Sequence, residues 1–257
     1  MTERDVDLAA MIVRTIEAEV AGAETATAYR TPLVAFAPAD DPGFAALPQV
    51  VDPMHKLPED LLPGARSVVS FFIPFDPQVV KANAASRTSV AREWAVAYVE
   101  TNALIARITR RVIERLAARG VQAAAERATH NFDTERLASW WSHKSAAVVT
   151  GLGSFGLHHM VITDAGCAGR LGSLVLDADL PERGTPGGER CLYFHDGSCQ
   201  ACVARCPVGA LDAGTGAIDK QRCWQRCLGV AETYEALGSA DVCGKCVIGP
   251  CAFASAV

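Results

Sequence analysis

Apolar positions recur at helical spacing in two long stretches of the chain. One is VDLAAMIVRTIEAEVA at residues 6–21, and the other runs from about Val90 through Ala118 and ends at Gly120. Apolar side chains repeated every three to four residues line one face of a helix. We therefore expect two long amphipathic helices.

Short apolar runs bounded by turn residues indicate strands. ARSVVSFFIPF (residues 65–75) is rich in β-branched and aromatic residues and lies between Gly64 and Pro77, which suits a buried strand. HMVITD (residues 159–164) and RLGSLVLDADL (residues 170–180) indicate two more strands around the turn AGCAG. This mixture favours an α+β or an α/β fold, and we predict α+β, with a mixed sheet and flanking helices.

The composition is that of an ordinary globular protein. Of the 257 residues, 50% are hydrophobic and 21% are charged, and the formal net charge is -5. This negative charge argues against nucleic acid or an anionic lipid surface as the partner. The start MTERDVDL lacks the pattern of an export signal, and no run is long enough to span a membrane. We expect a cytoplasmic protein with no membrane partner.

The ten cysteines are concentrated in the last part of the chain. All ten lie at or after Cys167. Proline and glycine crowd together in PERGTPGGER (residues 181–190), as they do in linkers and turns, and nine cysteines follow this segment. We predict an α+β domain at residues 1–185 and a small ferredoxin-like domain at residues 186–257.

Three cysteines and a proline match the cluster-binding run of bacterial ferredoxins. In that run the cysteine before the proline ligates the other cluster of a pair. Cys199, Cys202 and Cys206, followed by Pro207, match its last three positions. The first position is not a cysteine, and the nearest upstream thiol is Cys191, which a loop insertion could bring in.

Eight cysteines suffice for two 4Fe-4S clusters with crossed ligands. Cys227 lies one helical turn after Cys223 and could replace it, although we expect a free thiol there. Cys167, in the turn AGCAG, is expected to be a small turn residue, with a redox or ligand role as the alternative. We assign one cluster to Cys191, Cys199, Cys202 and Cys251, and the other to Cys206, Cys223, Cys243 and Cys246.

Zinc is the main alternative for these cysteines, because paired Cys-x-x-Cys units also build tetrahedral zinc sites. Zinc requires neither the ferredoxin spacing nor the proline, and it does not need so many thiols in one segment. A disulfide scaffold is disfavoured because the chain is neither small nor evidently secreted. We therefore predict iron–sulfur clusters, and with them electron transfer.

Three segments before the cysteines form a second set of motifs. They are PEDLLPGARSVVSFFIPF, GLGSFGLHHMVIT and RLGSLVLDADLP, of which LLPGARSVV (residues 61–69) and GLGSFG (residues 151–156) are the most telling. In this order, from roughly Pro58 onward, they resemble the epoxyqueuosine reductase family. The resemblance implies a corrinoid-binding N-terminal domain of nitroreductase-like fold, with cobalamin close to one cluster, as in the related reductive dehalogenases.

The resemblance makes the glycine loop a candidate cofactor site, since glycine lets the backbone approach a flat ligand closely. A tight turn is the alternative. No Asp-x-His-x-x-Gly motif occurs, so the corrinoid rests on the resemblance alone. His158 and His159 begin the next predicted strand, so at most one of them should face a site. The candidate cofactor-binding residues are Gly151, Gly153, Ser154, Phe155, Gly156 and His158.

Two catalytic candidates lie in DTERLASWWSHKSA (residues 133–146), which we predict to be a helix leading into the glycine loop. Asp133 near its start would be a helix cap or a proton donor, and the family uses an acid upstream of this loop. His143 is the second candidate, because a near-neutral pKa suits proton delivery. Trp140 and Trp141 are expected to pack in the core.

Two departures from the family bear on the substrate. The family loop usually reads Gly-Leu-Gly-Trp-x-Gly-Lys, whereas Ser154, Phe155 and Leu157 take those places here and no lysine follows. Family members that act on tRNA also carry helical repeats after the clusters, while this sequence ends six residues past Cys251. With the acidic net charge, these departures lead us not to expect tRNA as the substrate.

The predicted function is an iron–sulfur oxidoreductase that resembles epoxyqueuosine reductase. Electrons would pass through two 4Fe-4S clusters to a cobalamin or a substrate in the N-terminal domain. We expect an electron-donor protein such as a ferredoxin or flavodoxin, and a small-molecule substrate. The alternative is a non-enzymatic electron-transfer or cofactor-handling protein without corrinoid, and a third option places flavin in the same pocket.

Overall fold

The computed structural model describes residues 2–185 and 187–257 of the chain. It is 41% helical and 16% strand, which confirms the α+β class. Within these residues, no helix is both long enough and apolar enough to cross a membrane.

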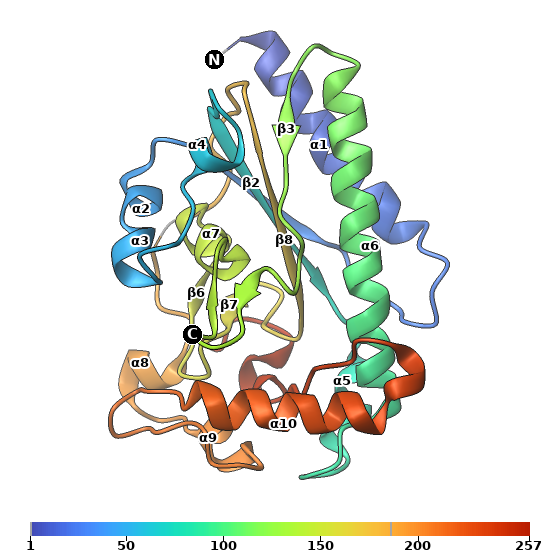
Figure 1. Cartoon of the computed structure of the whole chain (residues 1–257), viewed down its shortest axis with the longest axis vertical. Coiled ribbons are helices and arrows are strands. Elements are labelled where there is room, and N and C mark those ends of the chain that lie inside the picture. Colours follow the sequence, from blue (N-terminus) through green and yellow to red (C-terminus); the bar gives the residue numbers. More distant parts are fainter. Residues whose placement is uncertain (1, 186) are drawn as a thin grey trace.

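A four-stranded sheet lies at the centre of the molecule (Figure 1). β2 is buried at every position, as its β-branched and aromatic residues predict. All pairings described within this sheet are antiparallel, so the expectation of a mixed sheet is wrong. The apolar pattern predicts strands but carries no information on their direction. The order is β1 (Leu33–Pro38), β2 (Ser67–Pro74), β8 (Gly169–Leu176) and β3 (Ala123–Ala124).

Two long helices cover one face of this sheet, α1 (Glu3–Ala21) and α6 (Arg92–Ala117) (Figure 1). A capping box at Thr2 begins α1. Buried side chains recur every three to four positions along each helix, such as Leu8 and Ile12 on α1. Both predicted amphipathic helices are therefore confirmed, and they pack with the sheet into one hydrophobic cluster.

The other face of the sheet packs against α7 (His143–Val149) and several short elements. Trp141, just before α7, is 1% exposed and stacks with Phe44 at 6.3 Å between ring centroids. The short helices on this side are α2 (Pro42–Ala45), α3 (Leu47–Val50) and α4 (Pro58–Leu61).

The segment at residues 133–146 is not the single helix that its sequence predicts. β4 (Phe132–Asp133) and β5 (Ala138–Ser139) pair as short strands, and α7 begins only at His143. The reason is tertiary, because the Trp141 indole is buried in the core and its N–H donates a hydrogen bond to β8. Fixing this side chain outweighs local helix propensity.

His158 and His159 lie in the turn of a hairpin and not at the start of a strand. The hairpin pairs β6 (Gly153–Phe155) with β7 (Val161–Thr163). His159 has a φ of 58°, a left-handed conformation that strands do not use. His158 is 3% exposed, so it is the more deeply buried of the two.

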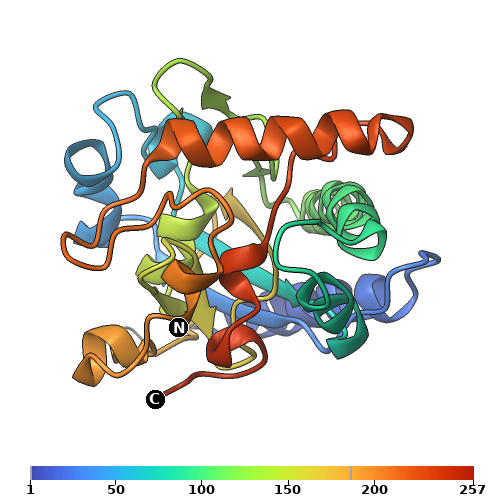
Figure 2. The ribbon, with the colours of Figure 1, turned by 90° about the horizontal axis from the view of Figure 1, so that it is seen from below.

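The cysteine-rich segment lies across one end of the sheet (Figure 1). Seen from below in Figure 2, its longest helix, α10, spans most of this end. Its helices are α8 (Leu192–Asp196), α9 (Ala201–Arg205) and α10 (Lys220–Thr233), with 3-10 helices η1 (Glu235–Leu237), η2 (Lys245–Val247) and η3 (Pro250–Ala252).

This segment is joined to the N-terminal part by a shared hydrophobic cluster. Trp94 of α6 belongs to the same cluster as Val247 of η2. Tyr234, which follows α10, donates a hydrogen bond from its hydroxyl to the carbonyl of Val90 at 2.6 Å. The domain boundary at residues 181–190 stays a prediction.

Candidate functional site

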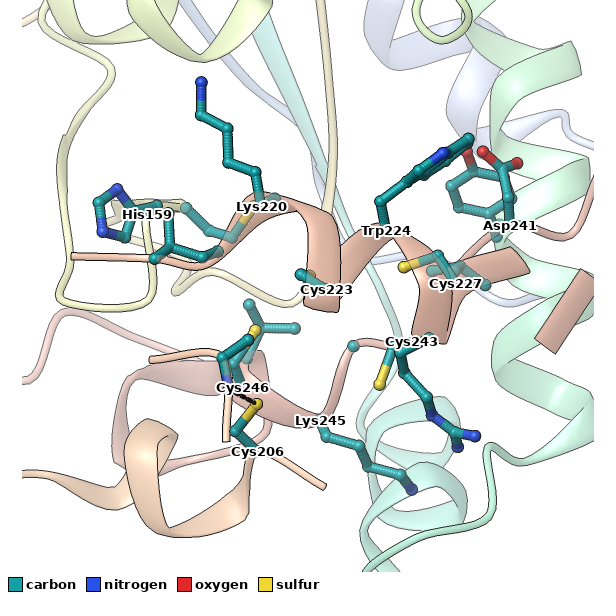
Figure 3. Close-up of a pocket in the computed structure, with 18 of the residues that line it drawn as sticks. His159, Cys206, Lys220, Cys223, Trp224, Cys227, Asp241, Cys243, Lys245 and Cys246 are labelled. Atoms are coloured by element: carbon teal, nitrogen blue, oxygen red, sulfur yellow. Dashed lines mark hydrogen bonds between the residues drawn. The ribbon is translucent and has the colours of Figure 1, made fainter. Parts of the chain in front are cut away.

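A cavity of about 480 Å³ lies between the end of the sheet and α10. Its walls include apolar side chains such as Leu211, Ile218 and Val242. Cys167 lines it, and so do five cysteines of the cysteine-rich segment, whose side chains Figure 3 shows around one space. They are Cys206, Cys223, Cys227, Cys243 and Cys246.

Local structure explains how several of these thiols reach the cavity. Cys206 ends α9, and the proline after it cannot continue a helix. Asp219 caps α10 by accepting a hydrogen bond from a first-turn backbone N–H at 2.9 Å. Cys223 and Cys227 then lie one turn apart on α10, and therefore on the same side of it.

Gly244, between Cys243 and Cys246, has a conformation that requires glycine. Its φ is 69°, and a Cβ at this position would lie 2.2 Å from Cε2 of Trp94. Trp94 is 3% exposed, and its indole nitrogen Nε1 has no hydrogen-bond partner. The loop that carries two of the cysteines therefore packs directly on this indole.

Lys245 fixes the same loop to the N-terminal part. Its side chain is buried, and its Nζ donates to Oδ1 of Asn83 at 2.9 Å, to the carbonyl of Ser86 at 3.0 Å and to the Asn83 carbonyl. Asn83, at the end of α5 (Pro77–Ala84), donates from Nδ2 to the carbonyl of Cys243 at 3.1 Å. Three oxygens thus satisfy the buried ammonium group.

The thiols of this cavity change one another's pKa. Burial raises the pKa of Cys246, and the charges of Cys223 and Cys243 raise it further. Hydrogen bonding with Cys227 lowers the pKa of Cys223 to about 7, and the same contact raises the pKa of Cys227. The thiolate is the form of cysteine that binds metals, so Cys223 is partly in that form near neutral pH.

Cys191, Cys199, Cys202 and Cys251 form a second group of thiols. Burial raises the pKa of Cys202 to about 11, and the charges of Cys251, Cys191 and Cys199 raise it as well. Three of these cysteines lie at or near the starts of α8 and α9, and Cys251 comes from η3. The eight cysteines that the sequence assigns to two clusters therefore lie in two neighbouring groups.

Cys251 also has a histidine and a further cysteine beside it. His158 Nε2 lies 3.5 Å from its Sγ, and Cys167 Sγ lies 3.7 Å away. The contact with Cys167, supported by His158, lowers the pKa of Cys251 to about 5 and raises that of Cys167. The three ligand atoms lie within 4.8 Å of one another, a spacing that suits a single metal ion.

A second cavity, of about 230 Å³, shares part of its wall with the first. Lys144 and Arg170 line both cavities. The Arg170 guanidinium lies over the ring of Tyr98, 4.2 Å from the ring centroid. Burial lowers the pKa of both basic residues. Two partly buried cations therefore lie next to the thiols.

Asp133, a predicted catalytic residue, lies outside the walls of both cavities. Its carboxylate accepts hydrogen bonds from the backbone N–H groups of Glu135 at 2.8 Å and Arg136 at 2.9 Å. These bonds lower its pKa, the one from Arg136 most. Asp133 therefore caps a tight turn and stays ionised.

His143, the other predicted catalytic residue, is buried and lines the smaller cavity. Its Nε2 donates to the carbonyl of Arg127 at 2.8 Å, and its Nδ1 accepts from the hydroxyl of Ser173 at 2.7 Å. Ser173 accepts in turn from the Trp141 indole N–H at 2.9 Å, which assigns these directions. Burial lowers the pKa of His143 to about 4, so the imidazole is neutral near pH 7.

None of the six residues predicted to bind a corrinoid is part of either cavity wall. Gly153 packs so closely that a Cβ would lie 2.3 Å from the carbonyl oxygen of Ile162. The hydroxyl of Ser154 accepts a hydrogen bond from the backbone N–H of Arg190 at 3.2 Å. His159, in the turn of the same hairpin, does line the larger cavity. The six are Gly151, Gly153, Ser154, Phe155, Gly156 and His158.

The larger cavity is lined by Arg226, Lys245 and three more basic residues, Lys144, Arg170 and Lys220; none of the five was predicted from the sequence. Arg170 lies just before the buried positions of β8. A charge at such a place is the one local sign in the sequence that the residue could line a site. Lys144 and Lys220 lie in the first turns of α7 and α10. Solvated lysines are common at such positions, so the sequence does not distinguish these two. Only the tertiary structure brings the three together.

Comparison with known proteins supports the resemblance to the epoxyqueuosine reductase family. No family model matches the chain. An epoxyqueuosine reductase from Yersinia pestis is 37% identical over 81 residues, which are 31% of this chain and 18% of that protein. The matched segment is thus less than a fifth of that relative's length.

Solved structures of epoxyqueuosine reductases share the fold. The enzyme from Streptococcus thermophilus matches with a TM-score of 0.59 at 15% identity, over 94% of this chain and 64% of that one. A complex of epoxyqueuosine reductase with an epoxyqueuosine-modified stem loop of tRNA-Tyr matches with a TM-score of 0.57 at 16% identity, over 86% of this chain and 57% of that one. At these identities the likeness is one of fold.

The complex corrects the expectation against tRNA. A protein of this fold was solved with a tRNA stem loop, so that expectation is wrong. It relied on two departures from the family and on the net charge of the whole chain, which does not describe the charge at a site. Here Lys144, Arg170 and Lys220 line one cavity of an acidic protein.

Proposed function

We propose that the chain is an iron–sulfur reductase that passes electrons through two 4Fe-4S clusters to a cobalamin or a substrate held by its N-terminal part. One observation carries this proposal: thiols from separate segments converge in two groups, and one group lines a cavity of about 480 Å³ beside two partly buried cations. The ligand sets are Cys191, Cys199, Cys202 and Cys251, and Cys206, Cys223, Cys243 and Cys246.

The spacing of the thiols supports clusters over zinc. The four ligands of a zinc site bind one ion and must lie close together, whereas each thiolate of a 4Fe-4S cluster binds a different iron. Among the described residues, the trio with single-ion spacing is His158, Cys167 and Cys251, which contains one of the eight assigned cysteines. The wider spacing of the others suits a cluster.

The residues beside the thiols have roles in this proposal. A corrinoid, when bound, would supply a reduced cobalt centre that acts on the substrate. His143, neutral and held at both ring nitrogens, positions α7 and with it Lys144. Lys144 donates to the carbonyl of His159 at 3.1 Å, and its lowered pKa eases proton release beside the thiols. Asp133 takes no step, because it lies outside both cavities.

The test is metal and cofactor analysis of protein purified without oxygen. We expect about eight iron and eight sulfide per chain, from two four-iron clusters. Zinc instead of iron, or far fewer irons, would contradict the cluster assignment. Reduced protein loaded with cobalamin would then be assayed on substrates that include an epoxyqueuosine-modified tRNA stem loop, because a protein of this fold was solved with one.

A second candidate is an electron-transfer protein without corrinoid. The observation that favours it is the glycine loop, whose six candidate residues lie outside both cavity walls. Cobalamin titration of the cluster-loaded protein separates the two. Stoichiometric binding supports the reductase, and full cluster content without cobalamin binding supports the carrier.

A further inference from the structure

Arg170 is a partly buried cation that forms no ion pair in the described structure. It lies near the start of β8, where it contributes to the wall between the two cavities. Its Nε is buried without a hydrogen-bond partner, and it forms no ion pair within the described residues. The ring of Tyr98 covers one side of the guanidinium. An unpaired charge in such a place is costly, so a compensating group is expected.

The acid whose charge acts on Arg170 is Asp241, which lines the larger cavity but not the smaller one. Its charge opposes the lowering of the pKa of Arg170 by burial. Oδ2 of Asp241 lies 3.3 Å from Nε2 of His130, and its Oδ1 is buried without a hydrogen-bond partner. The smaller cavity has no aspartate or glutamate among its described wall residues. On the side of the smaller cavity, the Arg170 guanidinium therefore faces a wall without a described carboxylate.

Lys144 adds a second cation to the same wall. It donates to the carbonyl of His159 at 3.1 Å, which leaves two of its three N–H groups free of protein partners in the described structure. Burial and the charge of Lys220 both lower its pKa. The charges of Cys246 and Cys223 act on Lys144, whereas those acting on Arg170 are from Tyr98 and Asp241.

We propose that Arg170 and Lys144 form a subsite for a small oxyanion, the phosphate or carboxylate group of a ligand that occupies the smaller cavity. The planar guanidinium presents paired N–H donors that match two oxygens of such a group, and the ammonium adds a point charge. A cavity of about 230 Å³ has room for the anionic end of a ligand whose remainder extends toward the thiols. This inference does not depend on the identity of the metal or of the corrinoid.

Binding of inorganic phosphate and of acetate to the anaerobically purified protein tests the subsite. Titration calorimetry would be run at constant ionic strength, with chloride as the reference anion. We expect one saturable site per chain for at least one of the two anions, and the preferred anion tells a phosphate subsite from a carboxylate subsite. Binding of neither anion above the chloride reference would overturn the proposal.

Substitutions separate this site from general attraction to a basic surface. Arg170→Met should weaken binding of the preferred anion by about tenfold or more, because it removes charge-assisted hydrogen bonds. Lys144→Met should weaken it by a smaller factor. Arg115→Met removes the same charge from an exposed position of α6 and should leave binding unchanged.

The unfolding temperature with and without added anion tells an anion-binding role of Arg170 from a purely structural one. Without added anion, Arg170→Met should unfold at the same or a higher temperature than the parent, because a partly buried charge without an ion pair is removed. Phosphate or acetate should raise the unfolding temperature of the parent more than that of this variant. If Arg170→Met does not fold, Arg170→Lys and Lys144→Met test the same point. Equal binding by the parent and a folded Arg170 variant would overturn the proposal even if the iron content agrees with two clusters.

Discussion

Two buried tryptophans differ in whether their indole N–H groups donate a hydrogen bond. The Trp141 N–H donates to Ser173 at 2.9 Å, whereas the Trp94 N–H has no partner among the described residues. Replacement by phenylalanine removes the same atoms at both positions. In metal-free protein we expect Trp141→Phe to lower the free energy of unfolding by about 1–2 kcal/mol more than Trp94→Phe, because only the first breaks a hydrogen bond. Denaturant unfolding of both variants measures this, and equal losses would contradict it.

His143 predicts how stability depends on pH. Its pKa is about 4 in the folded protein, against an ordinary value of 6.5, so the unfolded chain binds more protons between these values. Its contribution to stability is therefore complete at neutral pH and is lost as the pH falls from about 6.5 to 4. The loss amounts to about 3 kcal/mol. Unfolding of the parent and of His143→Gln at several pH values measures the slope, which should be shallower in the variant over this range.

The sequence reveals single residues only where their chemistry is local. The cysteines are recognisable because their spacing is a short-range property of the chain, and the structure gathers them into two groups. Arg170 and Lys144 gave no such signal, because each is an isolated charge whose meaning depends on the cavities around it. The catalytic role of Asp133 stays a prediction, since an aspartate that caps a turn looks the same in sequence as one that faces a substrate.

Among the elements, the long periodic ones were predictable and the short ones were not. α1, α6 and β2 have enough apolar positions for their pattern to decide the structure. The stretch at residues 133–146 failed because burial of Trp141 and the pairing of β4 with β5 depend on partners far away in the sequence. The same holds for the turn at His159, where the left-handed backbone has no sequence signature.

The contact between η2 and α5 should contribute strongly to stability. Lys245→Met would remove the buried ammonium that joins these elements and leave oxygens of Asn83 without their donor, at a cost of about 3 kcal/mol. We also expect less iron per chain, because the loop carrying Cys243 and Cys246 loses its anchor. Denaturant unfolding and iron analysis measure both effects. Lys81→Met, at an exposed position of α5, is the control and should change stability by less than about 0.5 kcal/mol.

At the scale of the whole molecule, the cysteine-rich segment and the N-terminal part should unfold together. One hydrophobic cluster contains Phe75 and Trp94 from one part and Cys202 and Val230 from the other. Removal of iron with a chelator should therefore lower the temperature of the main calorimetric transition, because bound metal stabilises only the folded state. Two separate transitions, with the upper one unmoved by the chelator, would show instead that the two parts fold independently.

α10 has a kinetic consequence for whatever its cysteines bind. The helix forms one wall of the cavity and contributes Cys223 and Cys227 to it. At its C-terminal end, the Tyr234 hydroxyl donates a hydrogen bond to the carbonyl of Val90. A group bonded to both walls can dissociate only when α10 separates from the opposite wall. This local opening breaks the bonds to the ligand cysteines and the Tyr234 hydrogen bond together. Its residence time should therefore follow the rate of that local opening and not the width of the entrance.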